Sequence, residues 1–239
     1  MVAPVPRWFE QPKGGCGGSF ISTQHVITAQ HCVLGDSVFN IFYNGHSYEA
    51  EVVAKASNDI TDRTLDCNLG FTLSRSTDMA ILRLKTVPNG CVIPICLPSL
   101  TDDSIISDNL TMASFRGGYH EKSIPVIDGK ACFEKYRNKE ILNLTECHDK
   151  LEARSALHEN VLFKNDELSY NFVCSPGDMI THGDSGSPLM KKDDQNIWTL
   201  IGIVRGYESS EDDTFRLFAD YQTIFPQLSW IHESMQNKD

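Results

Sequence analysis

The sequence predicts an all-β protein with a β-barrel architecture. Short runs of apolar residues recur along the chain, and turn signals separate them. One of these signals is the Asn44-Gly45 pair, which lies between two runs with alternating apolar residues, as in a β-hairpin. Helical patterns are confined to residues 132–170 and to the C-terminal end. We therefore expect strands to form most of the fold.

The first half of the chain is expected to form several strands. Apolar residues are dense over residues 20–33, a pattern that predicts buried strands leading into a short helical turn. Residues 37–57 carry the hairpin signal, and residues 79–87 predict a further strand. The polar stretch 57–77 is expected to be a loop. The Pro-rich stretch 89–104 is expected to link the two halves.

The second half begins near Asp108 and is again rich in strand patterns. Strands are expected at residues 123–128, 170–175, 188–192, 197–206 and 214–221. Residues 132–170 carry charges and spaced apolar residues, a partly helical pattern. A helix over about 226–236 is expected to end the chain.

Composition excludes several classes of function. The chain has 239 residues, of which 41% are hydrophobic and 22% charged, as expected of a globular protein with a substantial core. Its net charge of −11 argues against nucleic acid and anionic membrane as partners, because both are negatively charged. No apolar stretch approaches the length of a membrane span. The acidic surface is expected to favour solubility.

The cysteines and sequons indicate a secreted protein. Eight cysteines are an even number, which is typical of disulfides formed in an oxidising compartment. Glycosylation is expected at Asn109 and Asn143, each of which begins an Asn-Leu-Thr sequon. Residues 1–15 lack the apolar core of a signal peptide, so we expect a leader and an activation segment to be missing from this chain. A cytosolic protein with reduced cysteines is the alternative.

One short stretch, residues 182–188 (HGDSGSP), predicts nucleophilic catalysis. Ser185 lies between glycines, which allow a tight turn that exposes the hydroxyl. A serine hydroxyl needs a base, and the base needs a group that orients it. His31 in "VITAQHCV" and Asp78 in "STDMAILRL" are the candidates for these two roles. Their order along the chain, His, Asp, Ser, is that of one known type of catalytic triad.

These segments together resemble the trypsin/chymotrypsin-like serine protease family. "CGGSFISTQHVITAQHC" resembles the family's CGGSLIS…VLTAAHC, with Gln30 in place of an alanine, and "GDSGSP" resembles GDSGGP. "TDMAILRL", "VIPICLP", "LIGIVRG" and "LSWI" resemble further family segments in the same order. The resemblance implies one domain over residues 1–239 with two six-stranded antiparallel barrels, at about 16–95 and 108–226, and the C-terminal helix. It places the active site between the barrels.

The resemblance also implies a role for each catalytic residue. Ser185 is the nucleophile, His31 is the general base and acid, and Asp78 orients His31. The backbone N–H groups of Gly183 and Ser185 form the oxyanion hole. Asp184 pairs with an α-amino group that activation cleavage creates, but the Ile-Val-Gly-Gly segment that carries this group in the family is not found in the sequence. No metal or cofactor is expected.

Specificity is left open between two interpretations. The family residue six positions before the serine lies at the base of the primary pocket, and here it is Met179, which favours an apolar side chain. If the register shifts by one, Asp178 takes this position and favours Lys or Arg at the cleaved bond. The resemblance places His182 at the mouth of the cleft. Arg205 and Tyr207 fall on the pocket wall, where they are expected to alter or partly block the pocket.

The resemblance pairs four of the cysteines. Cys16 and Cys32 match the disulfide beside the catalytic histidine, and Cys132 and Cys174 match a second family disulfide. The remaining four cysteines allow three connectivities, between which the sequence does not choose: Cys67, Cys91, Cys96 and Cys147.

The sequence therefore predicts a secreted serine endopeptidase that acts through an acyl-enzyme intermediate. A protein or peptide is the expected substrate, a protease inhibitor is a further expected partner, and the chain is expected to be a monomer. The alternative is a catalytically impaired protease homologue that acts as a binding or regulatory module. The altered wall at Arg205 and Tyr207 favours this alternative, and the complete set of His31, Asp78 and Ser185 opposes it.

Overall fold

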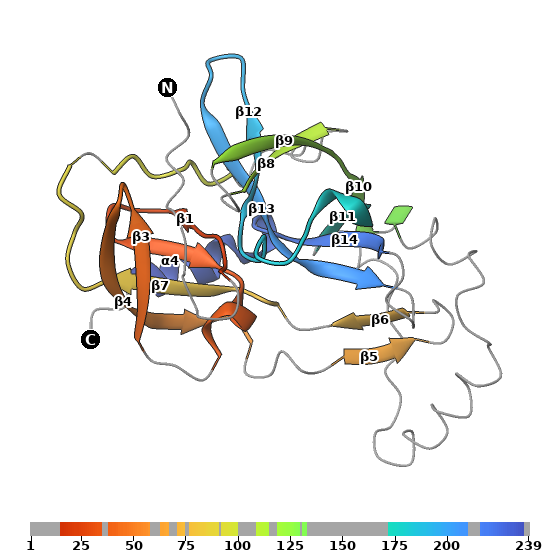
Figure 1. Cartoon of the computed structure of the whole chain (residues 1–239), viewed down its shortest axis with the longest axis horizontal. Coiled ribbons are helices and arrows are strands. Elements are labelled where there is room, and N and C mark those ends of the chain that lie inside the picture. Colours follow the sequence, from red (N-terminus) through yellow and green to blue (C-terminus); the bar gives the residue numbers. More distant parts are fainter. Residues whose placement is uncertain are drawn as a thin grey trace, which may run out of the picture.

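The computed structural model consists of two curled antiparallel sheets with one α-helix at the C-terminal end (Figure 1). The structure describes residues 15–34, 38–57, 63–66, 71–74, 77–90, 92–99, 109–114, 119–129, 131–132, 172–209 and 216–236. The partly helical pattern predicted over residues 132–170 lies almost entirely outside these ranges. The mostly β architecture agrees with the predicted fold class.

The first sheet has five strands in the order β1-β2-β7-β4-β3. The strands are β1 (Ser19–Phe20), β2 (His25–Thr28), β7 (Ala80–Leu84), β4 (His46–Lys55) and β3 (Val38–Tyr43). The hairpin between β3 and β4 turns at Asn44 and Gly45, whose φ angles are 50° and 78°. Both angles are positive, as a tight hairpin turn requires, and Asn and Gly tolerate them better than other residues.

The second sheet has seven strands in the order β10-β11-β14-β13-β12-β8-β9. Its strands are β8 (Asn109–Ser114), β9 (His120–Pro125), β10 (Ile127–Asp128), β11 (Phe172–Pro176), β12 (Pro188–Lys192), β13 (Trp198–Ser209) and β14 (Arg216–Thr223). The described parts of the chain thus form two curled antiparallel sheets, of five and seven strands, which is consistent with the two antiparallel barrels expected. Sequence patterns locate strands, but side-by-side pairing in space decides which sheet each strand joins.

A third, two-stranded sheet corrects the prediction that residues 57–77 are a loop. β5 (Arg63–Asp66) pairs with β6 (Phe71–Ser74) in an antiparallel register. Polar residues dominate the segment as a whole, and the alternation of apolar and polar residues at 71–74 is only four residues long, so sequence reasoning did not find these strands. Their mutual backbone pairing supplies the hydrogen bonds that a strand needs.

The two large sheets share a hydrophobic core. One cluster of buried side chains includes Phe20 and Leu82 from the first sheet, Met190 and Ile203 from the second, and Ile231 from the C-terminal helix α4 (Leu228–Gln236). Figure 1 shows α4 behind the first sheet, although it follows the last strand of the second sheet. The helix therefore helps to hold the two sheets together.

A second cluster of buried side chains belongs to the seven-stranded sheet alone, and it includes Leu110, Val173, Leu189 and Tyr221. The linker at residues 92–99 contacts both sheets, because the N–H of Ile95 donates to Phe20 O and the N–H of Leu200 donates to Cys96 O. These contacts position the two halves of the predicted active site relative to each other.

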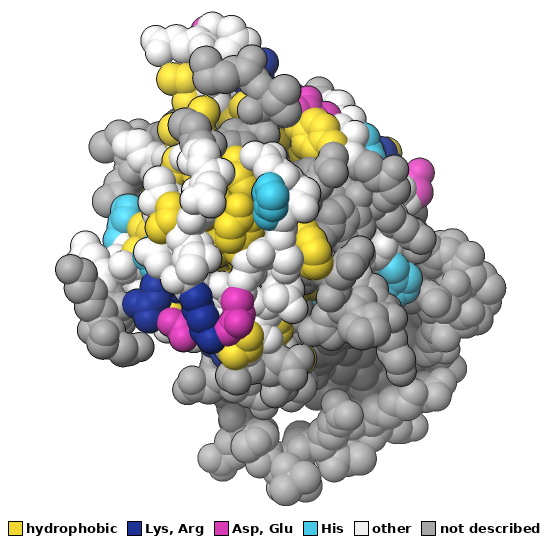
Figure 2. Space-filling view, turned by 60° about the vertical axis from the view of Figure 1, so that its left-hand side comes forward, with side chains coloured by type: hydrophobic (Ala, Val, Ile, Leu, Met, Phe, Trp, Pro, Cys, Tyr) yellow, Lys and Arg dark blue, Asp and Glu magenta, His cyan; other side chains and the backbone are white. Residues whose placement is uncertain are grey.

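The surface carries charges of both signs. On one face, basic and acidic side chains lie next to one another (Figure 2). Among the described residues, Arg83 pairs with Glu51 and Lys85 pairs with Glu49, in both cases between β7 and β4 or the turn that follows β7. No helix in the described part of the chain combines the length and the apolar content that crossing a membrane would take.

Candidate active site

His31 lies in a short 3-10 helix, η1 (Gln30–Val33), that follows β2. The buried Gln30 side chain fixes this turn to the end of β4, because its Nε2 donates to Ser57 O at 2.5 Å and its Oε1 accepts from Ser57 N at 3.0 Å. Gln30 stands where the family motif has an alanine. Its side-chain amide makes two hydrogen bonds, which an alanine does not make, and they attach η1 to the backbone of Ser57.

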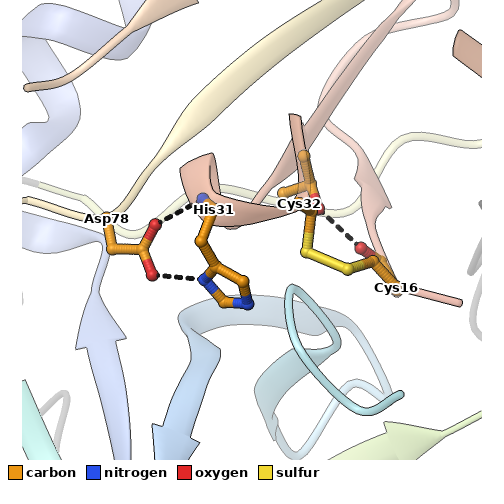
Figure 3. The surroundings of a disulfide bond; sticks show 6 residues. Cys16, His31, Cys32 and Asp78 are labelled. Carbon is orange, nitrogen blue, oxygen red and sulfur yellow. Dashed lines mark hydrogen bonds and ion pairs between the residues drawn. A yellow bond between two sulfur atoms is a disulfide. The ribbon is translucent and has the colours of Figure 1, made fainter. Parts of the chain in front are cut away.

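Asp78 binds His31 through both carboxylate oxygens (Figure 3). Oδ1 accepts from the backbone N–H of His31 at 2.9 Å, and Oδ2 lies 2.6 Å from the His31 Nδ1. Asp78 directly precedes Met79 and β7 and is only 6% exposed. This geometry orients the imidazole and leaves its Nε2 as the nitrogen that can exchange a proton with substrate.

The environment of Asp78 favours the ionised carboxylate. Burial raises the pKa of Asp78, but the hydrogen bonds and the charge interaction with His31, together with the nearby Arg205, lower it by more. The pKa of Asp78 therefore lies below its ordinary value of 3.8. A carboxylate that stays ionised near neutral pH can stabilise an imidazolium on His31.

Ser185 lies in a turn between the 3-10 helix η2 (Gly177–Met179) and β12, and its side chain is half-buried. Gly183 and Gly186 adopt φ angles of 95° and 75°, which favour glycine. The N–H of Gly186 donates to Val204 O at 2.7 Å. The N–H groups of Gly183 and Ser185 have no hydrogen-bond acceptor within the described ranges. They are thus available to bind an oxyanion, as the resemblance implies.

Two connections bring the Ser185 turn to His31. Ser185 O accepts from the N–H of Gly17 at 2.7 Å, and the neighbouring Cys16 forms a disulfide with Cys32, which follows His31. Figure 3 shows this disulfide beside the His31–Asp78 pair. The Ser185 backbone is therefore linked to the segment of His31 through one hydrogen bond, to Gly17, and one disulfide, Cys16–Cys32.

The next residue, Gly186, packs directly against the segment that leads to His31. A Cβ atom at Gly186 would collide with Thr28 Oγ1 and Gly17 O, so only glycine fits at this contact. Thr28 Oγ1 also donates to Gly17 O at 2.7 Å. The turn after Ser185 and the end of β2 thus meet without intervening side chains.

Asp184 has partners that the sequence did not predict. The carboxylate is 2% exposed, and its Oδ1 accepts from Ser114 Oγ at 2.5 Å while its Oδ2 accepts from the N–H of Thr181 at 2.9 Å. The resemblance implies an α-amino partner, but its segment is not found in the sequence, so Asp184 was expected to be unpaired or paired otherwise. Ser114 lies 70 positions away, in a strand that was not predicted, and no motif marked it.

Both candidates for the base of the pocket lie in or beside η2. Met179 is half-buried and packs against the core of the second sheet, whereas Asp178 is exposed. Lys122, which sequence reasoning did not single out, donates from Nζ to Met179 O at 3.2 Å. Which of Met179 and Asp178 lies at the base of a substrate pocket stays a prediction.

The remaining wall candidates have well-defined partners. Tyr207 OH lies 2.7 Å from His182 Nε2, and the two rings meet edge to face with centroids 5.5 Å apart. Arg205 Nε lies 3.5 Å from Asp220 Oδ2, and both side chains are nearly buried. Asp220 was missed because it lies in an apolar strand pattern. The register of β13 and β14 pairs Asp220 with Gly206, and Arg205 falls in the irregularity between Val204 and Gly206, so only the folded sheet shows that Arg205 lies close to Asp220.

Both disulfides implied by the resemblance are present, Cys16–Cys32 and Cys132–Cys174. Cys96 is exposed and has no disulfide partner among the described cysteines, whereas Cys67, Cys91 and Cys147 lie outside the described residues. Of the two predicted glycosylation sites, Asn109 begins β8, and Asn143 lies outside the described residues.

One group of side chains has the spacing of a metal site. The ligand atoms of Cys16, His31 and Cys32 lie within 4.8 Å of one another. The two sulfurs, however, are bonded to each other, so they do not offer the thiolates that a metal ion binds. The arrangement is a disulfide next to a histidine.

Comparison with known proteins agrees with this geometry. The family model "Trypsin" matches residues 8–231. "CLIP domain-containing serine protease B9" of Anopheles gambiae is 29% identical over 233 residues, which cover 82% of this chain and 51% of that protein. "Vitamin K-dependent protein C" of Rattus norvegicus is 27% identical, covering 95% of this chain and 47% of that protein. "Serine protease 28" of Mus musculus is 27% identical, covering 92% and 78%. The chain spans about half the length of the first two relatives.

Proposed function

Because this chain belongs to the trypsin family, we propose that it is a serine endopeptidase that hydrolyses protein or peptide substrates through an acyl-enzyme intermediate. The observation that carries the proposal is the His31–Asp78 pair. Asp78 holds both the backbone and the ring of His31, and the Ser185 turn is tied to the same place through Gly17 and the Cys16–Cys32 disulfide. These connections support the assignment of His31, Asp78 and Ser185 as a catalytic triad.

In the proposed reaction, Ser185 Oγ attacks the carbonyl carbon of the scissile bond. His31 Nε2 accepts the hydroxyl proton, and the ionised Asp78 stabilises the resulting imidazolium. The N–H groups of Gly183 and Ser185 bind the oxyanion of the tetrahedral intermediate. His31 then returns the proton to the leaving amine. A water molecule, deprotonated by His31, hydrolyses the acyl-enzyme and restores the serine hydroxyl.

We propose that the enzyme prefers an uncharged, apolar side chain at the cleaved bond. Met179 is half-buried and packs against the core of the second sheet, while the carboxylate-bearing Asp178 is exposed beside it. The contact between Tyr207 and His182 supports a pocket of limited size, because it joins the turn of Ser185 to β13. A peptide library cleaved after Leu, Met or Ala rather than Arg or Lys is the expected result.

The cellular setting is proposed on the same basis. The two disulfides fit a secreted protein, because such bonds persist in oxidising compartments. Glycans at Asn109 and Asn143, a protease inhibitor as a partner and a monomeric state remain predictions. Mass spectrometry of the secreted protein with and without glycosidase treatment tests the glycans, and light scattering tests the monomer.

A fluorophosphonate probe tests the proposed chemistry directly, because it phosphonylates only an activated serine. The expected result is one label per chain, mapped to Ser185 by peptide mass spectrometry and abolished in Ser185→Ala and His31→Ala. Ser123→Ala is the matched control, since Ser123 is an exposed serine in β9 far along the chain from the triad. A correctly folded wild-type protein that never reacts at Ser185 would rule out the enzyme and favour the non-catalytic homologue.

A further inference from the structure

Arg205 occupies the extra position of a β-bulge in β13. Val204 pairs with Tyr221 and Gly206 pairs with Asp220, so β13 has one residue more than β14 at this point, and that residue is Arg205. Bulges are common next to active sites, where they change the direction of a side chain. The position of Arg205 is therefore a feature of the backbone and not only of its side chain.

The residue before Arg205 is bonded directly to the turn of the proposed nucleophile. The N–H of Gly186 donates to Val204 O at 2.7 Å, and the N–H of Val204 donates to Ser187 O at 2.9 Å. Val204 is itself 1% exposed, so these two hydrogen bonds are protected from water. They fix the backbone that carries Arg205 relative to Ser185.

A nearly buried carboxylate holds the side chain of Arg205. Arg205 Nε lies 3.5 Å from Asp220 Oδ2, and the two side chains are 12% and 11% exposed. A buried ion pair contributes little net stability compared with apolar side chains of similar volume. Stability of the fold alone therefore does not explain why this pair lies next to the nucleophile turn.

The charge of Arg205 also acts on the triad. Arg205 interacts electrostatically with Asp78, whose buried carboxylate binds the ring of His31. Asp220 carries the opposite charge and weakens this effect without abolishing it. The three charged side chains thus form a row in which the charge of each one depends on its neighbour.

Other groups near the triad are unchanged in the variants compared below. The Cys16–Cys32 disulfide beside the triad does not titrate. Two titratable residues lie in the nucleophile turn, the buried Asp184 and the exposed His182, whose Nε2 lies 2.7 Å from Tyr207 OH. Differences between the variants therefore report the charges of Arg205 and Asp220.

We propose that Arg205 is a positioning residue of the triad, because the bulge and Asp220 hold its positive charge beside Asp78. The inference rests on the proposed serine protease function, and it names a residue that sets the pH range of that site. The His31–Asp78 pair acts as a base while it carries one negative charge, and it becomes neutral when it takes up a proton. A nearby positive charge favours the charged, basic state, so Arg205 extends the reaction to lower pH.

The experiment measures the rate constant for fluorophosphonate labelling of Ser185 from pH 5 to pH 9, and compares the acid-side midpoint of this profile between variants. Arg205→Gln is expected to raise the midpoint by about 0.5 pH unit or more, because the positive charge is removed. Asp220→Asn is expected to lower it by about 0.5 pH unit, because Arg205 loses its counter-charge. Arg205→Lys keeps the charge and should stay within about 0.2 pH unit of wild type.

Two further variants separate the charge effect from a loss of structure. The double variant Arg205→Gln, Asp220→Asn has no unpaired buried charge, so it keeps the test intact if Arg205→Gln alone fails to fold. Its midpoint is expected about 0.5 pH unit or more above that of Asp220→Asn. Arg83→Gln is the matched control, because it removes an arginine from an ion pair with Glu51 in the first sheet, and it should shift the midpoint by less than about 0.2 pH unit.

The opposite directions of the two single variants are what a purely structural role does not explain. Loss of packing or of fold would lower the rate constant in both variants without moving their midpoints apart. Shifts of Arg205→Gln and Asp220→Asn in the same direction, or shifts of less than about 0.2 pH unit in both, would overturn the inference.

NMR spectroscopy separates this inference from the proposed function. The imidazole signals of His31, identified by their absence in His31→Gln, titrate whether or not Ser185 reacts. Their midpoints are expected in the same order, with Asp220→Asn below wild type and Arg205→Gln above it. If wild-type protein is never labelled but the midpoints keep this order, the proposed function fails and the inference about Arg205 stands. If labelling occurs and the midpoints of all variants coincide, the proposed function stands and the inference fails.

Discussion

Asp78 illustrates how a single side chain combines opposing effects. Its burial disfavours the charged form, whereas two hydrogen bonds to His31 favour it, and the second effect is larger in total. The same two bonds set the position of the imidazole. Asp78 therefore stays ionised and at the same time orients the proposed base.

Asp78→Asn is expected to lower the labelling rate of Ser185 by about 10⁴-fold. The asparagine amide is uncharged, so it does not stabilise an imidazolium on His31. It also no longer fixes His31 in the tautomer that carries its proton on Nδ1. The fluorophosphonate rate constant at pH 7.5 measures the effect. Asp193→Asn, at an exposed aspartate in the turn between β12 and β13, is the control and should react like wild type. A loss smaller than tenfold in Asp78→Asn would contradict the assigned role.

Asp78 should also contribute to the acid sensitivity of the fold. Its pKa is lower in the folded than in the unfolded chain, so its ionised form stabilises the protein above pH of about 4, the ordinary value in unfolded chains. This stabilisation is lost as the pH falls through the folded pKa. Asp78→Asn is therefore expected to lose less free energy of unfolding than wild type between pH 5 and pH 2, as urea titrations would measure. An equal loss of unfolding free energy in wild type and in Asp78→Asn between pH 5 and pH 2 would contradict this expectation.

His25 should give a second, distinct pH dependence. It lies opposite Arg83 in the register of β2 and β7, and its Nδ1 lies 2.8 Å from Ser22 Oγ. Burial, and then the charge of Arg83, lower the pKa of His25 below 6.5. Since the unfolded chain binds the proton more readily, the free energy of unfolding should fall as the pH drops through 6.5 and level off below the folded pKa.

The test of His25 is a neutral replacement. His25→Gln is expected to weaken the loss of stability between pH 7.5 and pH 5.5, as urea titrations at each pH would measure. The same substitution at His46, an exposed histidine at the start of β4, is the matched control. Equal pH dependence in wild type and His25→Gln would show that His25 does not contribute.

At the scale of elements, the turn between η2 and β12 is the most constrained segment of the site. Gly183 and Gly186 both have positive φ angles, and Gly186 also approaches Thr28 and Gly17 too closely for a Cβ atom. The glycine pattern of the motif therefore has two physical causes, backbone conformation and close contact with the first sheet.

Gly186→Ala separates these causes when it is compared with Gly45→Ala. Gly45 has a similar φ of 78°, but a Cβ there would meet nothing within 4 Å. Gly45→Ala is expected to cost about 1 kcal/mol of unfolding free energy from strain alone, and Gly186→Ala more than about 2 kcal/mol. Chemical denaturation measures both, and only Gly186→Ala should also slow labelling of Ser185. Equal costs would show that the contact is unimportant.

Elements differed in how well their sequences predicted them. The β3–β4 hairpin followed from Asn44 and Gly45, because the residues of a tight turn determine its conformation locally. β12 begins and ends where its apolar pattern predicted. By contrast, β5 and β6 are only four residues long and lie in a mostly polar stretch, and their pairing with each other supplies the backbone hydrogen bonds of both strands. Local patterns do not encode such pairing.

The whole molecule depends on contacts between its two sheets. Buried side chains of both sheets and of α4 form one cluster, and the proposed active site contains residues from both halves of the chain. His31 and Asp78 come from the first half, and Ser185 comes from the second. Interactions that hold the sheets together are therefore expected to hold the site together.

Ile231→Ala tests the contribution of α4 to this arrangement. Ile231 is fully buried in the shared cluster, so its truncation should lower the free energy of unfolding by about 2–5 kcal/mol. His232→Ala, at the exposed neighbouring position, should change it by less than about 0.5 kcal/mol. Denaturant titration measures both variants. A cost at Ile231 as small as at His232 would mean that α4 does not stabilise the shared core.

The sequence by itself determined the strand-rich class and the glycine turn, and it predicted His31, Asp78 and Ser185 as the triad, because turn residues and motifs are local properties of the chain. Only the tertiary structure decided that Ser114 bonds Asp184, that Arg205 faces Asp220 and that the strands divide into sheets of five and seven among the described residues. These features join positions far apart in the chain, and such pairings depend on how the two sheets pack and on the register of their strands.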